Sequence, residues 1–275
     1  MTPHTLPSYA ELHALSNFSF QRGASHPQEL VARAHALGYS ALALTDECTV
    51  AGAVRAHMRA KALGLKLIVG AEFALQGTGH CLIVLPCNLS GWGNLCEFIT
   101  AARRAAPKGE YRVVLGESNL ALLQDCEVLV APAREDHSDN YNATDLIAAN
   151  AIITLAKGLF GSKTWLAVHL QLGADDALWL QQLERLSAQT GVPLVAAGNV
   201  HMHARSRKPL QDVITAVRLG KTVAECGFAL QPNAEAHLRS RLRLGQIYPP
   251  ELLANTLVVA ARCTFSLDEI QYNYP

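Results

Sequence analysis

Polar side chains that bind metals or move protons stand near the ends of several apolar runs in this chain. They are His13, Asp46, Glu47, Glu72, His80, His169, Asn199 and His201. Imidazole nitrogens and carboxylate oxygens brought together from separate segments are ligands that suit Zn²⁺ and Mn²⁺. Such a cluster activates water and neutralises the charge that develops on a phosphoryl group. The pattern therefore indicates a metal-dependent hydrolase site.

The alternative interpretation is that these side chains are structural. The sequence has no H-E-x-x-H motif and no C-x-x-C pair, so spacing along the chain does not by itself indicate a metal. A single histidine near a strand end more often takes part in structural hydrogen bonds. On the residues alone, both interpretations stay open.

The elements that must position these side chains alternate between apolar strands and amphipathic helices. Ser25, with Gln28 three residues on, predicts a helix cap, and Gly38, Gly64 and Gly191 predict helix ends. The pattern predicts strands over residues 10–15, 41–44, 66–75, 80–86, 128–132, 165–171 and 193–200. It predicts helices from 25 to 38 and over 50–63, 93–104, 144–157, 175–190, 209–219 and 250–263, with a loop over 105–116.

About seven strand–helix units with continuously apolar strands predict a parallel sheet that helices cover on its faces. For 275 residues we expect a closed or nearly closed α/β barrel, and an open doubly wound sheet is the alternative. Functional side chains gather at the carboxyl ends of the strands in such barrels. We expect the barrel over residues 1–221 and a short helical extension over residues 222–275.

Composition and charge limit the classes of function. Lys plus Arg and Asp plus Glu both number 23, so this segment lacks the basic excess that a strongly DNA-binding surface needs. No signal-peptide pattern and no apolar run long enough for a bilayer are found, which predicts no membrane contact. The seven cysteines lie mostly in apolar runs, which indicates reduced thiols and a cytoplasmic protein.

Several segments resemble, in order, the motifs of the PHP (polymerase and histidinol phosphatase) domain family. Residues 11–19 (ELHALSNFS), 43–48 (ALTDEC) and 68–73 (IVGAEF) resemble its first three motifs. The match continues through 80–85 (HCLIVL), 91–95 (GWGNL), 195–203 (VAAGNVHMH) and 207–212 (RKPLQD). Residues 253–263 and 265–275 resemble the point where error-prone C-family bacterial DNA polymerases leave this domain for their palm. The resemblance covers nearly the whole chain.

The resemblance implies a distorted (β/α)7 barrel that holds up to three metal ions and hydrolyses phosphoesters. Some C-family polymerases keep a metal-dependent 3′–5′ exonuclease in this domain, and others use it as a scaffold. Carried over by position, the metal ligands would be His13, Glu72, His80 and His201. His169 falls near a further ligand position whose register the match leaves open.

Departures from the family pattern predict a reduced site. Leu15 replaces the second histidine of the first motif, and Arg22 replaces an aspartate. Glu47 and Asn199 replace a histidine and an aspartate, and of the two only Glu47 still supplies a carboxylate. A permanently charged guanidinium repels a nearby divalent cation. An inward-pointing Arg22 would sit where a metal otherwise lies and would pair with Glu47 or Glu72. We therefore expect at most one residual Zn²⁺ or Mn²⁺.

Two main hypotheses follow from the resemblance. The first is a structural module that positions the rest of an error-prone polymerase chain, or binds replication and translesion proteins, and meets DNA only indirectly. Nucleotide addition would need a palm with Mg²⁺, so this chain alone is not expected to polymerise DNA. The second is a metal-dependent phosphoesterase or 3′–5′ exonuclease that uses His13, Glu47, Glu72, His80 and His201. A stand-alone amidohydrolase-like or histidinol-phosphatase-like enzyme is a third alternative.

Overall fold

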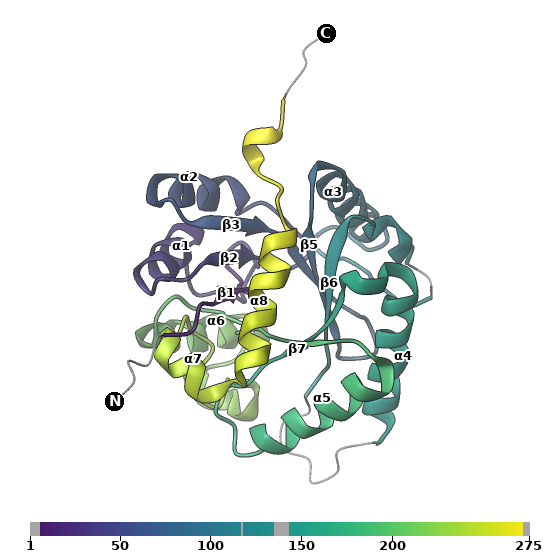
Figure 1. Cartoon of the computed structure of the whole chain (residues 1–275). Helices are drawn as coiled ribbons and strands as arrows, with labels where there is room; N and C mark the ends of the chain where they lie inside the picture. Colours follow the sequence, from purple (N-terminus) through teal and green to yellow (C-terminus); the bar gives the residue numbers. More distant parts are fainter. Residues whose placement is uncertain (1–5, 117, 135–142, 272–275) are drawn as a thin grey trace, which may run out of the picture.

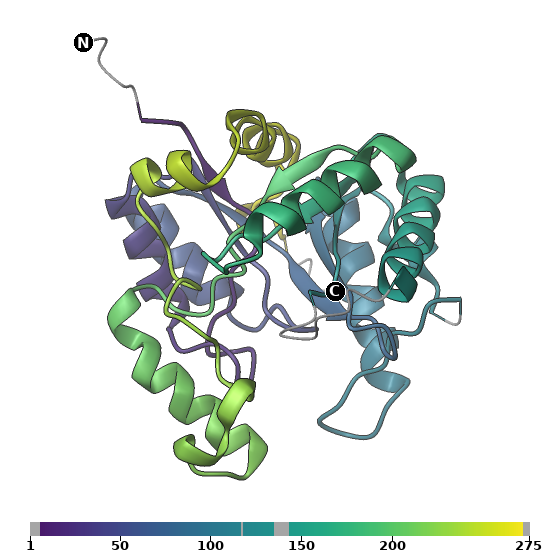
Figure 2. The ribbon, with the colours of Figure 1, turned by 90° about the horizontal axis from the view of Figure 1, so that it is seen from below.

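Strands and helices alternate along the chain, and the helices surround the strands in both views (Figures 1 and 2). The computed structural model describes residues 6–116, 118–134 and 143–271. The α/β class predicted from the apolar pattern is confirmed. The last four residues of the 265–275 segment lie outside the described residues.

Three parallel strands form the first sheet and are connected through two helices. The strands are β1 (Ala10–Glu11), β2 (Ala41–Leu44) and β3 (Lys66–Val69), and the helices are α1 (Pro27–Ala36) and α2 (Ala53–Leu63). The cap of α1 is His26 and not the predicted Ser25, because the His26 N–H donates to Glu29 Oε2 at 2.8 Å. Gly64 ends α2 as predicted, with a left-handed φ of 68°.

Five strands form the second sheet, in the order β4–β5–β6–β7–β8. They are β4 (Ala71–Ala74), β5 (Cys81–Pro86), β6 (Cys126–Ala131), β7 (Thr164–Val168) and β8 (Leu194–Ala196). β6, β7 and β8 are parallel, but β5 runs antiparallel to β4 and β6, so the prediction of an all-parallel sheet is wrong there. The link over residues 75–80 is too short for the crossover that a parallel pair needs.

The remaining helices cover the second sheet and one end of the strands (Figure 1). They are α3 (Leu89–Arg104), α4 (Ala143–Phe160), α5 (Asp176–Thr190), α6 (Lys208–Leu219), α7 (Arg241–Ile247) and α8 (Pro250–Arg262). Single 3₁₀ turns lie at Leu120–Leu123, Gly161–Lys163, Arg205–Arg207, Val223–Glu225, Gly227–Ala229 and Leu267–Glu269. The sequence did not predict α7, because a seven-residue helix shows too few turns for a periodic pattern.

Two hydrophobic cores lie on opposite faces of the strands. Alternate residues of the strands, such as Ala43, Ile83 and Leu129, join Val259 and Ala260 of α8 in an inner core. The intervening residues pack outward against the helices in a larger core. Because successive strand side chains point to opposite faces, this alternation means that one face of the strands packs with α8 and the other face packs with the surrounding helices.

The two sheets meet at isolated bridges and are not joined into one closed ladder. The bridges pair Ala14 with Val200 and Glu47 with Glu72. The predicted strand over residues 66–75 is interrupted at Gly70, where the chain passes from the first sheet to the second. The predicted (β/α)7 barrel is therefore not confirmed as a closed ladder, and the division at residue 221 stays a prediction.

Gly70 and Gly93 are expected to respond oppositely to alanine. A Cβ on Gly70 would lie 2.5 Å from the Val84 carbonyl oxygen, whereas a Cβ on Gly93, within α3, meets nothing within 4 Å. Gly70→Ala should lower the free energy of unfolding by about 2–3 kcal/mol, because backbone must move. Gly93→Ala should raise it by about 0.5–1 kcal/mol, because alanine has the higher helix propensity. Urea unfolding checks both, and equal effects would contradict the packing argument.

Candidate functional site

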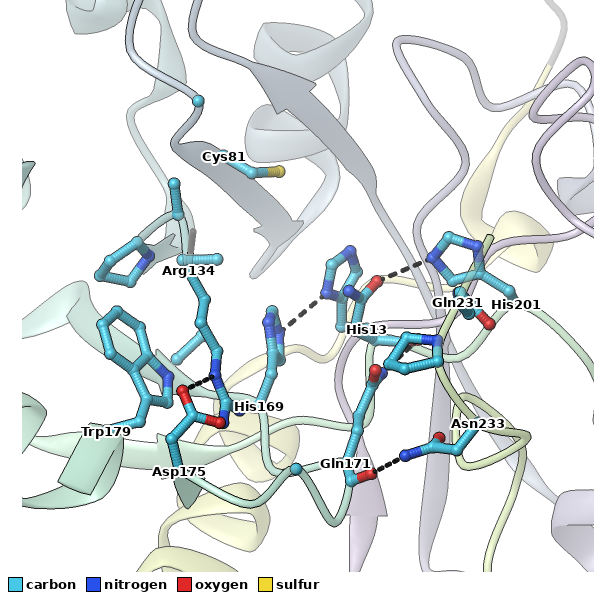
Figure 3. Close-up of a pocket in the computed structure, with 18 of the residues that line it drawn as sticks. His13, Cys81, Arg134, His169, Gln171, Asp175, Trp179, His201, Gln231 and Asn233 are labelled. Carbon is cyan, nitrogen blue, oxygen red and sulfur yellow. Dashed lines mark hydrogen bonds and ion pairs between the residues drawn. The ribbon is translucent and has the colours of Figure 1, made fainter. Parts of the chain in front are cut away.

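The polar side chains that the sequence singled out gather at one edge of the strands. They come in turn from β1, β2, β4, β5, β7 and β8 or from the residues beside those strands: His13, Glu47, Glu72, His80, His169 and His201. His80 precedes β5, and it reaches this edge because β5 runs antiparallel to its neighbours. A cavity of about 1140 Å³ opens here, and all of these side chains except Glu47 line it (Figure 3).

Arg22 lies between two of the predicted ligands. Its Nη1 atom is 2.8 Å from Glu47 Oε2 and also contacts Glu72 Oε1. The second oxygen of Glu72 lies 2.6 Å from His13 Nε2, and both of these side chains are 3% exposed. Gln211 of α6 donates to the Arg22 carbonyl oxygen at 2.7 Å and holds the loop in place. The predicted pairing of Arg22 is thus found with both carboxylates.

The charge of Glu72 is stabilised although the group is buried. Burial alone would raise the pKa of Glu72, but the Arg22 guanidinium and the hydrogen bond with His13 outweigh burial and lower the pKa to about 2. Burial tends to lower the pKa of Arg22, yet Glu72 and Glu47 raise it above its ordinary value. The two carboxylates therefore share one cation supplied by the chain itself.

Two histidines of the site, His169 and His201, are held in the neutral form. Burial, followed by the Arg22 charge, lowers the pKa of His201 to about 3. Burial and the neighbouring His13 lower the pKa of His169 well below its usual range. His13 Nδ1 lies 3.1 Å from His169 Nε2, and His201 Nε2 lies 3.0 Å from Asn199 Oδ1 (Figure 3). Each of these contacts satisfies a ring nitrogen without a metal.

His80 and Glu47 have structural partners. His80 Nδ1 accepts a hydrogen bond from the Ala133 N–H at 2.8 Å. Glu47 Oε1 accepts from the Tyr111 hydroxyl at 2.8 Å, while its other oxygen faces Arg22. His80 thus lines the cavity and Glu47 lies beside it, and the hydrogen bonds of Glu47 occupy both of its oxygens.

Asp46 anchors the loop that carries Arg22. Its carboxylate accepts from the Ser16 N–H, the Ser16 hydroxyl and the Ser19 hydroxyl, each at 2.7 Å. Asp46 is 1% exposed, and burial raises its pKa against these three hydrogen bonds. With its oxygens satisfied by the chain, Asp46 fixes the loop over residues 16–22.

The residues present do not fit a multi-metal cluster. Among the residues that the structure describes, no group of three or more His, Cys, Asp or Glu side chains is arranged to hold a metal ion. Leu15 is fully buried and supplies no ligand. Asn199 adopts a left-handed φ of 45°, a conformation that Asn tolerates, and directs its amide oxygen to His201. Arg22 brings a positive charge to the same place.

Two residues that the sequence did not indicate complete the arrangement. Tyr111, from the predicted loop over 105–116, donates to Glu47, and no motif marked it. Gln211 is 3% exposed although it is polar, and its position on the inward face of α6 was the available signal. Inward-facing glutamine is unusual and requires a partner, which here is the Arg22 carbonyl oxygen.

Comparisons with known proteins agree on one family. The PHP domain family matches residues 11–169. The chain is 52% identical over 98% of its length to an error-prone DNA polymerase of Dechloromonas aromatica, and 51% identical over 97% of its length to one of Methylococcus capsulatus. It spans about a quarter of the length of these relatives, 26% and 24%.

Solved structures agree on the fold. An amidohydrolase from Chromobacterium violaceum has a TM-score of 0.53 at 15% identity and covers 71% of this chain and 88% of its own. A candidate metal-dependent phosphoesterase from Bifidobacterium adolescentis has a TM-score of 0.51 at 15% identity and covers 71% of this chain and 89% of its own. With the family match and the relatives along nearly its whole length, the chain belongs to the PHP domain family, in the form found in error-prone DNA polymerases.

Proposed function

We propose that this chain is the PHP module of an error-prone DNA polymerase and that its own role is structural. The observation that carries the proposal is Arg22, whose guanidinium pairs with both Glu47 and Glu72 in the place where the family pattern expects a metal. The guanidinium disfavours a divalent cation beside it, because like charges repel strongly in a low-dielectric cleft. The module keeps its shape without a metal.

The distorted (β/α)7 barrel is part of this proposal. It is supported by the inner core that the strands of both sheets share with α8, and by the bridges at Ala14–Val200 and Glu47–Glu72. Residues 222–275 would then be the extension that leads from the barrel toward the polymerase. α8 packs on β1 and β8, so this extension would also close one end of the barrel.

The activity of the whole polymerase belongs to the part of the relatives that this chain does not span. We propose DNA-directed nucleotidyl transfer in damage-tolerant replication and repair, with Mg²⁺ held by the palm. The direct partners would be the rest of the polymerase chain and replication or translesion proteins, and DNA would be met through them. No helix in the described part of the chain is long and apolar enough to cross a membrane, and all seven cysteines are free. The cytoplasm is the proposed compartment.

Metal analysis of the purified chain tests the structural role. After incubation with Zn²⁺ or Mn²⁺ and dialysis, the chain should retain far less than one equivalent, and it should release no nucleotide from a 3′ end. Arg22→Asp restores a carboxylate and removes the cation, so it should retain more metal than the wild type. Arg22→Gln removes the charge without adding a ligand and is the matched control. Stoichiometric metal together with 3′ turnover in the wild type would establish the phosphoesterase alternative instead.

A further inference from the structure

Two cysteines far apart in the sequence meet away from the candidate site. Cys87 directly follows β5 and Cys263 directly follows α8. The next residue, Thr264, donates to the Cys87 carbonyl oxygen through its N–H at 2.8 Å and through its hydroxyl at 2.9 Å. Cys263 Sγ lies 3.9 Å from the carbonyl oxygen of Leu85, two residues before Cys87, and Cys87 Sγ lies 3.9 Å from Glu127 Oε1. The two backbones are therefore in contact, and the two side chains lie at the same end of β5.

The two thiols differ in exposure and in acidity. Cys87 is partly exposed, whereas Cys263 is 2% exposed. The neighbouring Cys263 thiol lowers the pKa of the Cys87 thiol, against burial and the Glu127 carboxylate, and the Lys163 ammonium adds to the lowering. The Cys87 thiol and burial raise the pKa of Cys263. An accessible, more acidic thiol beside a buried one is the arrangement that favours oxidation of the first and attack by the second.

We propose that Cys87 and Cys263 form an oxidant-sensitive pair that closes to a disulfide and pins the segment after α8 to the end of β5. Cys126 lies on the neighbouring strand and is the competing partner, but it directs its thiol to the Gly91 carbonyl oxygen at 3.5 Å. This orientation favours Cys263 as the partner of Cys87.

The reaction needs a peroxide as the oxidant. The Cys87 thiolate attacks one oxygen of hydrogen peroxide, the O–O bond breaks, and Cys87 becomes a sulfenic acid as hydroxide leaves. Cys263 then attacks the Cys87 sulfur, the S–S bond forms and the S–O bond breaks. The departing hydroxide takes the Cys263 proton and leaves as water. Two thiols and one peroxide thus give one disulfide and two waters, with sulfur oxidised and peroxide oxygen reduced.

The position of the pair determines what the disulfide would hold. After Cys263 the chain continues between α2 and α3 (Figure 1). There Phe265 stacks on Trp92 with ring centroids 4.9 Å apart, and Asp268 pairs with Lys61 at 2.9 Å. Both of these contacts are reversible. A disulfide at the start of the segment would fix it covalently at the point where it leaves α8.

Thiol counting on the full 275-residue chain tests the proposal. After treatment with a small excess of hydrogen peroxide and unfolding, the number of free thiols should fall from seven to five. Peptide mapping should find the Cys87–Cys263 cross-link. The oxidised chain should melt at a Tm higher by about 10 °C, because the bond closes a very long loop, and dithiothreitol should reverse the shift.

Variants distinguish this pair from general oxidation. Cys263→Ser should leave a Cys87 sulfenic acid that dimedone traps, and Cys87→Ser or Cys87→Ala should abolish both the trapped adduct and the cross-link. Cys96→Ser, a half-buried cysteine of α3, is the matched control and should cross-link like the wild type. Seven free thiols after oxidation, or a cross-link between another pair, would overturn the proposal. Neither result bears on metal binding, so the structural role is tested separately.

Discussion

Replacing Arg22 with alanine is expected to lower the free energy of unfolding at pH 7 by about 3–5 kcal/mol. The substitution leaves Glu72, which is 3% exposed, as a buried carboxylate whose remaining partners are His13 and, at 3.9 Å, the Cys81 thiol. Removing one member of a buried ion pair costs more than the pair contributes, because the other charge keeps its desolvation penalty. Urea unfolding at pH 7 measures the loss.

The pH dependence of the stability loss in Arg22→Ala tests whether the unpaired Glu72 carboxylate causes that loss. The pKa of Glu72 is lowered from 4.5 to about 2 in the folded chain, so its contribution is fully present above pH 4.5 and is lost as the pH falls from 4.5 toward 2. The difference between wild type and Arg22→Ala should therefore shrink over this range. Arg185→Ala, an exposed arginine of α5, is the matched control and should stay within about 0.5 kcal/mol of the wild type. A loss below about 1 kcal/mol for Arg22→Ala would contradict the ion-pair role.

Replacing Asp46 with alanine is expected to cost about 3–5 kcal/mol, since hydrogen bonds to a buried charge contribute about 1.5–3 kcal/mol each and are not additive. The change removes the acceptor of three hydrogen bonds from Ser16 and Ser19, each at 2.7 Å. The loop that carries Arg22 then loses its anchor. Urea unfolding measures the stability, and hydrogen exchange at the Arg22 amide, which donates to the Ser19 carbonyl oxygen at 2.9 Å, measures the loop.

The serines supply the controls for Asp46. Ser16→Ala and Ser19→Ala each remove one donor and keep the carboxylate, so each should cost about 1–2 kcal/mol. Asp46→Asn keeps the shape but loses the charge and should fall between these values and Asp46→Ala. If Asp46→Ala cost no more than Ser16→Ala and left the Arg22 amide protected, the carboxylate would not be the anchor of the loop.

Much of the fold could be predicted from the sequence, because the strands are continuous apolar runs and glycine residues mark the ends of several helices. Gly64 and Gly191 end α2 and α5 in the left-handed conformation that they predicted. The sequence analysis did not predict the antiparallel direction of β5. The short link between β4 and β5, which contains Gly77 and Gly79, is a signal for an antiparallel turn. The break at Gly70 follows from the approach of the Val84 carbonyl oxygen, a tertiary contact that no local pattern contains.

The sequence predicted which residues lie near the candidate site better than it predicted their hydrogen-bond partners. The strand pattern indicated that His13 and Glu72 lie at the ends of strands, and the resemblance to the PHP family implied that Arg22 joins them. The sequence did not indicate that Ser16 and Ser19 donate hydrogen bonds to the Asp46 carboxylate. It also did not indicate that Tyr111 donates to Glu47 from a loop. These contacts depend on how loops fold over the strand ends, which residue type and spacing do not specify.

Arg22 also changes how this domain depends on its surroundings. A metal ion must be captured from solution, so the occupancy of its site follows the free concentration of the ion and falls when a chelator or a competing protein takes it. A guanidinium carried on the same chain as Glu47 and Glu72 is present at a fixed and high effective concentration whatever the solution contains. Under the proposed structural role, the folded domain would be independent of metal supply and of the proteins that deliver metals in a cell.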